Sequence, residues 1–131
     1  MSDPAPPISV LLIDDDREIR EVLGELLADE GFLVEASWNG ATALQRLQEG
    51  FRPDVIVLDI MMPIMDGSTF RTLQQQSALT SDIPVLGLTA FPPRDADFEC
   101  LTKPVHFDTL ALKIRSLAAA ARATVRPVST P

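Results

Sequence analysis

The sequence has one cysteine, Cys100, and few basic residues, since eleven Lys and Arg stand against nineteen Asp and Glu. A lone cysteine cannot form an internal disulfide, which fits a reducing compartment. The net charge of −8 at pH 7 opposes binding to a phosphate backbone. We therefore expect no direct contact between this chain and nucleic acid.

Long hydrophobic runs are also absent. No apolar run approaches the roughly 20 residues that a membrane span needs, and residues 1–7 have neither a basic nor an apolar signal segment. We therefore expect a cytoplasmic protein without membrane contact. The hydrophobic fraction of 46% excludes a wholly disordered chain, and 131 residues suit one domain with a real core.

Short apolar runs alternate with stretches in which apolar residues recur every three or four positions. The runs predict strands at residues 8–13, 33–36, 54–58, 83–88 and 100–102. The recurrence predicts helices at residues 17–29, 41–48, 68–76 and 107–122. This alternation is typical of a doubly wound α/β sheet. We expect one domain over residues 8–122, a disordered arm at 1–7 and a flexible tail or linker at 123–131.

Polar side chains follow several of these runs directly. Asp14 and Asp15 follow the first strand, Asp59 the third, Thr89 the fourth and Lys103 the fifth. Parallel strands bring their carboxyl ends to one edge of the sheet, where ligands bind. Three carboxylates, a hydroxyl and an ammonium at one edge can hold a divalent cation and a phosphoryl group. The pattern therefore suggests phosphotransfer onto an aspartate.

Five segments resemble the receiver domain of two-component response regulators. They are residues 10–16, 57–63, 65–67, 88–90 and 101–104. Each is weak alone, but together they stand in the family's order with strands and helices between them. The resemblance covers roughly residues 8–121. It implies a flavodoxin-like receiver fold, with a five-stranded parallel sheet in the order 2-1-3-4-5.

The resemblance also implies a signalling role, in which Asp59 accepts a phosphoryl group from a sensor histidine kinase or a phosphotransfer protein. The implied ligands of Mg²⁺ or Mn²⁺ are Asp14 (largely through water), Asp15, Asp59 and the backbone carbonyl of Met61. Thr89 and Lys103 would contact phosphoryl oxygens. Phosphorylation would switch a contact with a downstream protein. A homodimer is a further possible assembly. Beyond Mg²⁺-dependent self-phosphorylation and self-dephosphorylation, no enzymatic activity is expected.

Other interpretations of these residues stay open. Asp16 suits a helix cap, and Asp66 before Gly67 suits capping better than catalysis. His106, the sole histidine, suits a surface position rather than a phosphodonor. The chain could be a pseudo-receiver, an interaction module that does not use phosphorylation. A hydrolase of the haloacid-dehalogenase type fits less well, because it wants a carboxylate where Met61 stands.

The chain departs from the family between Thr89 and Lys103, which lie only fourteen positions apart. We expect the family's fourth helix to be absent or very short. Cys100 stands where the family usually has the aromatic residue that couples the threonine to the output surface. The coupling therefore differs here, or Phe98 or Phe91 replaces that residue. A missing helix should also expose apolar area near the fourth and fifth strands, which favours a dimer or partner contact.

The resemblance bears on the lifetime of the phosphorylated state too. Residues two positions past the acceptor and two past the threonine flank the path of the attacking water. Here they are Met61 and Phe91, and neither side chain can orient a water molecule by hydrogen bonding. We therefore expect slow loss of the phosphoryl group.

Overall fold

A computed structural model of the protein describes residues 6–60, 67–78, 80–92 and 98–124. The strands are β1 (Ser9–Ile13), β2 (Leu33–Ser37), β3 (Val55–Asp59), β4 (Val85–Thr89) and β5 (Glu99–Thr102). The helices are α1 (Arg17–Asp29), α2 (Gly40–Gln48), α3 (Gly67–Gln75) and α4 (Phe107–Thr124). No described helix combines the length and apolar character needed to cross a membrane.

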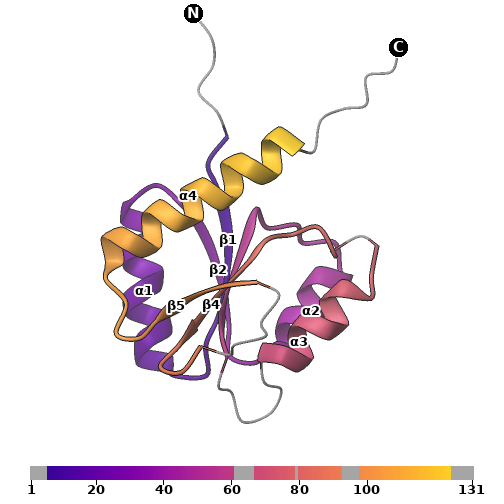
Figure 1. Ribbon diagram of the computed structural model, residues 1–131, viewed down its shortest axis with the longest axis horizontal. Helices are drawn as coiled ribbons and strands as arrows, with labels where there is room; N and C mark the ends of the chain where they lie inside the picture. The colour runs from indigo at the N-terminus through magenta and orange to yellow at the C-terminus, as the bar shows by residue number, and fades with distance from the viewer. Residues whose placement is uncertain (1–5, 61–66, 79, 93–97, 125–131) are drawn as a thin grey trace, which may run out of the picture.

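The strands form one parallel sheet in the order β2-β1-β3-β4-β5, so the predicted fold and strand order are confirmed. Helices α1 and α4 cover one face of the sheet, and α2 and α3 cover the other (Figure 1). Successive side chains of a strand point to opposite faces, so a strand covered on both sides is apolar throughout. All five residues of β3 and of β4 are accordingly buried.

Each face of the sheet has its own hydrophobic core. Under α1 and α4, Leu12 and Val57 belong to one cluster with Leu27 and Ile114. The cluster on the α2 and α3 face includes Leu11, Ile13, Ala43, Leu47, Ile56, Leu58 and Phe70. The two layers fix the sheet from both sides, so that its carboxyl edge is a rigid platform.

Local signals set the helix ends close to where the sequence predicts them. Asp16 is the N-cap of α1, and its carboxylate accepts hydrogen bonds from the amides of Glu18 and Ile19 at 2.9 and 3.2 Å. This confirms the capping interpretation of Asp16. Gly31, with φ of +94°, follows α1 and adopts a conformation that side chains disfavour. Each predicted element boundary lies within two residues of the observed one.

The connection between β4 and β5 is short, as predicted. Its described residues, 90–92 and 98, form no helix, and α4 after β5 is the next helix along the described chain. All five residues of β4 are buried, so the expected exposure of apolar area does not lie on the strand itself, whereas Phe91, two residues after it, is 84% exposed. Phe98 supplies part of the cover: its Cε2 atom lies 2.8 Å from the place that a Cβ on Gly87 would take.

Arg122 holds three distant segments together at the opposite edge of the sheet. Its guanidinium donates to the carbonyls of Pro6 and Pro7 at 3.2 and 3.3 Å and pairs with Asp54 at 2.9 Å. The Ser9 amide also contacts Asp54, donating a hydrogen bond to its carboxylate at 2.8 Å. The last turn of α4 is thus fixed to the starts of β1 and β3.

Candidate functional site

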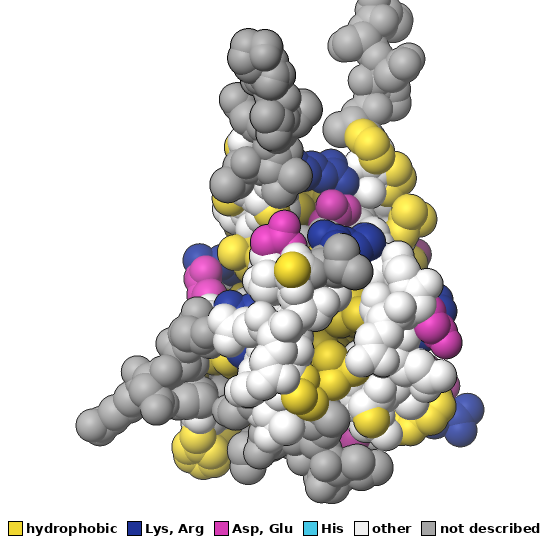
Figure 2. Space-filling model, turned by 90° about the vertical axis from the view of Figure 1, so that its right-hand side faces the viewer, with side chains coloured by type: hydrophobic (Ala, Val, Ile, Leu, Met, Phe, Trp, Pro, Cys, Tyr) yellow, Lys and Arg dark blue, Asp and Glu magenta, His cyan; other side chains and the backbone are white. Residues whose placement is uncertain are grey.

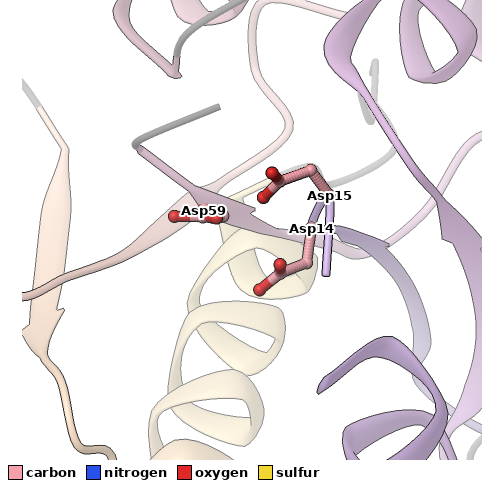
Figure 3. A group of neighbouring side chains, drawn as sticks. All are labelled: Asp14, Asp15 and Asp59. Carbon is pink, nitrogen blue, oxygen red and sulfur yellow. The ribbon is translucent and has the colours of Figure 1, made fainter. Parts of the chain in front are cut away.

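Three carboxylates meet at the carboxyl edge of the sheet. Asp14 and Asp15 follow β1 and Asp59 ends β3, and these two strands are paired neighbours. Each residue offers a carboxylate oxygen, and these three oxygens lie within 4.8 Å of one another. Figure 3 shows Asp14 and Asp15 directing their carboxylates to the side where Asp59 lies. Asp14 and Asp59 are buried, at 1% and 4% exposure, whereas Asp15 is open to solvent.

Asp14 is fixed by its backbone and by one carboxylate oxygen. Its amide donates to the carbonyl of Ser37 at 3.2 Å, and its own carbonyl accepts from Arg20 Nη1 at 2.9 Å. The amide of Asp16 donates to Oδ1 of Asp14 at 2.9 Å. The second oxygen, Oδ2, is buried and has no hydrogen-bond partner among the described residues.

The donor set fits a divalent cation. Burial raises the pKa of Asp14, and the nearby charge of Asp59 raises it further, against the lowering effect of the Asp16 amide. A buried carboxylate oxygen without a partner, close to two more carboxylates, is costly unless a cation joins them. Mg²⁺ takes oxygen ligands and keeps several waters, so three carboxylates suffice. The fourth predicted ligand, the carbonyl of Met61, lies outside the described residues.

Lys103 and Thr89 stand beside the cluster. The ammonium of Lys103 is 3.5 Å from Asp59 Oδ1, and the Lys103 amide donates to the Thr89 carbonyl at 2.9 Å. Thr89 is 1% exposed, and its hydroxyl accepts from the amide of Phe91 at 3.2 Å. The Lys103–Pro104 peptide bond is cis. The structure thus brings all five predicted side chains to one edge.

The arrangement makes the Asp59 carboxylate the meeting point of two kinds of charge. Oxygens of Asp14 and Asp15 lie within 4.8 Å of an Asp59 oxygen, and the ammonium of Lys103 lies 3.5 Å from Asp59 Oδ1. A group with several anionic oxygens, attached to Asp59, would therefore have both a cation site and an ammonium within reach. This geometry suits a phosphoryl group better than a neutral ligand.

Sequence reasoning missed the residues that support these five. Arg20 and Ser37 hold the backbone of Asp14, and the Phe91 amide holds the Thr89 hydroxyl. The contacts of Arg20 and Ser37 join separate elements through the backbone of Asp14, so residue spacing in the sequence does not predict them. His106 is exposed, as expected, and Asp66 lies outside the described residues.

Known proteins resemble this chain in both sequence and structure. The response regulator receiver domain family matches residues 10–115. The response regulator MprA of Mycobacterium sp. (strain KMS) is 35% identical over 119 residues, which is 85% of this chain and 50% of MprA. The transcriptional regulatory protein CpxR homolog of Haemophilus influenzae is 37% identical over 119 residues, covering 82% of this chain and 49% of that protein. The chain therefore spans about half the length of these relatives.

Solved structures show the same fold. Chemotaxis protein CheY4 of Vibrio cholerae superposes with a TM-score of 0.79 at 28% identity, covering 86% of this chain and 99% of CheY4. The signal receiver domain of a signal transduction histidine kinase from Syntrophus aciditrophicus gives a TM-score of 0.78 at 26% identity. That match covers 94% of this chain and 97% of the other. Both solved structures are thus covered almost completely by this one domain.

Proposed function

This chain belongs to the response regulator receiver domain family, and on that premise we propose that Asp59 accepts a phosphoryl group from a histidine kinase or phosphotransfer protein. The observation that carries the proposal is the place of Asp59, a buried carboxylate that belongs to an acidic cluster and lies 3.5 Å from the ammonium of Lys103. The phosphorylated state would switch the contact with a downstream protein.

The transfer step needs one nucleophile and one leaving group. An oxygen of the Asp59 carboxylate attacks the phosphorus of a phosphohistidine, and a phosphorus–oxygen bond forms while the phosphorus–nitrogen bond breaks. The electron pair of that bond leaves with the imidazole nitrogen, which takes up a proton. In self-dephosphorylation the Asp59 carboxylate is the leaving group instead. Water attacks the phosphorus, its oxygen forms the new bond while the bond to Asp59 breaks, and inorganic phosphate is released.

The surrounding residues would position and neutralise the group. Lys103 would pair with a phosphoryl oxygen as a point charge, and Thr89 would donate its hydroxyl to another. Asp14, Asp15 and Asp59 would hold Mg²⁺ or Mn²⁺, and the bound ion would offset negative charge on the phosphoryl oxygens. Because such transfer depends mainly on positioning and electrostatics, no further catalytic side chain is required.

An apolar groove beside Lys103 offers a docking surface for the donor. Its volume is about 670 Å³, and its lining consists of Glu18, Ile19, Val22, Leu23, Leu88, Lys103, Pro104 and Val105. Val22 on α1 is 52% exposed although it is apolar. Lys103 is part of this lining, and its ammonium lies 3.5 Å from Asp59 Oδ1. We therefore propose that an amphipathic helix of the donor, which carries the phosphohistidine, lies in this groove.

The chemistry is tested with a small donor. Wild type and Asp59→Asn are incubated with acetyl phosphate and Mg²⁺, or with EDTA, and intact mass is recorded. We expect one phosphoryl group on wild type with Mg²⁺ and none on the variant or in EDTA. Asp59→Asn keeps the shape of the side chain but removes the nucleophile. A phosphorylated Asp59→Asn protein would refute the assignment.

The docking surface is tested separately with Val22→Glu, using a donor protein that phosphorylates wild type. We expect the variant to lose transfer from the protein donor by at least about tenfold, because a charge enters the apolar groove, while acetyl phosphate still works. Leu112→Glu is the matched control, since Leu112 is 67% exposed on α4 and lies outside the groove lining. Equal losses in both variants would remove the groove from the proposal.

The second candidate is a pseudo-receiver that binds partners without phosphate. The short connection between β4 and β5 favours it, because the part of the fold between them is reduced. The complete set of five site residues argues for the phosphorylated receiver instead. Wild type that gained no phosphoryl group from acetyl phosphate, while Asp14, Asp15 and Asp59 still bound Mg²⁺, would favour the pseudo-receiver.

A further inference from the structure

We propose that Phe98, which lies just before β5, couples the phosphorylation site to α3. The inference rests on the proposed phosphoryl acceptance and adds the route by which the signal leaves the site. The route consists of Thr89 and Gly87 on β4, the ring of Phe98 before β5, and Arg71 on α3. Its basis is a chain of close contacts among the described residues.

The first contact joins Phe98 to β4. A Cβ on Gly87 would lie 2.8 Å from Phe98 Cε2 and 2.8 Å from Ile60 Cδ1, closer than real Cβ atoms approach. The ring therefore fills the space that only glycine leaves open. Gly87 stands two residues before Thr89 on the same strand, so both present the same face of the sheet. Because the ring of Phe98 is packed closely against Gly87, a shift of the β4 backbone at Thr89 would be transmitted to the ring.

The second contact joins Phe98 to α3. The guanidinium carbon of Arg71 lies 5.9 Å from the centroid of the Phe98 ring, at the outer range of a cation–π contact. Nη1 of Arg71 also donates to Gln74 Oε1 at 2.7 Å. Gln74 is fully buried, and its amide donates to the carbonyl of Ile83 at 3.2 Å and to that of Thr80. Arg71 is thus anchored in α3 and in the turn that follows it.

The site end of the route is Thr89. Its hydroxyl accepts from the Phe91 amide, so the start of the β4–β5 connection is bonded to the residue that would turn toward a phosphoryl oxygen. Cys100 lies beside Gly87 in the β-sheet register, and its small side chain leaves the ring of Phe98 its place. The ring of Phe91 is 84% exposed, so Phe91 contributes its amide but no packed aromatic contact.

The receiving surface is α3. Arg71 is the one charged residue in its sequence from Gly67 to Gln75, and Leu73 is 38% exposed. Figure 2 views the side of the molecule that carries α2 and α3, where hydrophobic side chains show between ridges of uncharged atoms. A small movement of α3 would therefore change a partly apolar surface to which this helix contributes one charged residue, Arg71, and such a surface suits a regulated protein contact.

Hydrogen exchange with beryllofluoride as the phosphoryl mimic tests the coupling. Bound beryllofluoride is measured by fluorine NMR, and amide exchange of α3 is compared with and without it. In wild type we expect exchange in α3 to change by about fivefold or more. In Phe98→Ala and Arg71→Met we expect this response to disappear, while both variants still bind beryllofluoride.

The matched control is Phe51→Ala. Phe51 packs against the same core cluster and lies under its own arginine, Arg46, at 5.6 Å, but the three atoms nearest to a Cβ on Gly87 belong to other residues. Its removal should leave the α3 response intact. Phe98→Leu gives the same test with a smaller cavity if Phe98→Ala does not fold.

The outcomes separate the two proposals. Wild type that does not bind beryllofluoride overturns the proposed function and the coupling with it. Wild type that binds beryllofluoride without a change in α3 overturns the coupling alone. A response of α3 that persists in both Phe98 variants also overturns it, as does an equal loss of response in Phe51→Ala.

Discussion

Asp14→Asn should stabilise the protein in the absence of divalent cations and weaken its response to Mg²⁺. The substitution keeps the shape of the side chain and removes one buried negative charge from the acidic cluster. Asp14 is 1% exposed, and its Oδ2 has no hydrogen-bond partner among the described residues. Its carboxylate is thus held against Asp15 and Asp59 without compensation at that oxygen.

The size of the effect follows from the distances. At the limiting separation of 4.8 Å, and with an effective dielectric constant of about 20, two unit charges repel by about 3.5 kcal/mol. Lys103 offsets part of the repulsion, and the hydrogen bond from the Asp16 amide becomes weaker with a neutral acceptor. We expect a net gain of about 1–3 kcal/mol in the free energy of unfolding. For a domain of this size that raises Tm by about 4–12 °C.

Urea unfolding followed by far-UV circular dichroism measures the gain, in EDTA and in Mg²⁺. Trp38 is a poor probe of unfolding because it is already 58% exposed in the folded protein. Asp16→Asn is the control: it removes the same charge two residues away and keeps a good N-cap. Mg²⁺ should stabilise wild type by mass action and the Asp14 variant less. An Asp14→Asn protein no more stable than wild type in EDTA would show that the carboxylate is not under strain.

Three further predictions concern stability and turnover. Gln74→Leu should lower the free energy of unfolding by about 2–4 kcal/mol in urea, because the carbonyls of Thr80 and Ile83 lose their donor, whereas the exposed Gln75→Leu should change it little. The hydrogen bond from Arg46 lowers the pKa of Glu35 from its usual value, so this pair stabilises the protein fully above the usual pKa of a glutamate, and the gain is lost as the pH falls through the lowered pKa; Glu35→Gln should cost less than about 1 kcal/mol at neutral pH, and a cost that does not shrink in acid would contradict the assignment. Phe91→Glu should speed loss of the phosphoryl group several-fold, because a carboxylate can orient the attacking water, and equal decay rates in a time course would mean that Phe91 does not shield the site.

Much of the fold follows from short-range patterns in the sequence. The runs at residues 10–13, 55–58 and 85–88 are apolar because both faces of the sheet are covered, and this alone indicates buried parallel strands. Parallel strands share one carboxyl edge, so the residues after each run had to meet. The positions of Asp14, Asp59 and Thr89 therefore needed only the order of the elements, and the structure places them as predicted.

The consequence of the short β4–β5 connection could not be predicted in the same way. Counting residues between Thr89 and Lys103 shows that little room remains for a helix. It does not show what covers β4 instead. The cover depends on Phe98 fitting over Gly87 in register with Cys100, a match of side-chain shapes across separate segments. β4 itself is buried for that reason, and the expected apolar exposure near it is found at Phe91.

The contacts that support the site residues could not be predicted from the sequence, for a related reason. Arg20 reaches the carbonyl of Asp14 from α1, and Arg71 reaches the ring of Phe98 from α3. Either arginine could equally have been a solvated residue on a helix surface. Only the tertiary arrangement gives such a side chain a partner, so its function can be inferred from coordinates and not from spacing.

The most direct test of phosphoryl acceptance by Asp59 is to locate the phosphoryl group on the chain. Wild type is phosphorylated with acetyl phosphate and Mg²⁺, and the acyl phosphate is then reduced with borohydride, which converts a phosphoaspartate into homoserine. Peptide mass spectrometry identifies the residue that changed. If Asp59 is the phosphoryl acceptor, we expect homoserine at position 59 and unmodified Asp14 and Asp15. Homoserine at position 14 or 15, or none at all in protein that binds Mg²⁺, would contradict it.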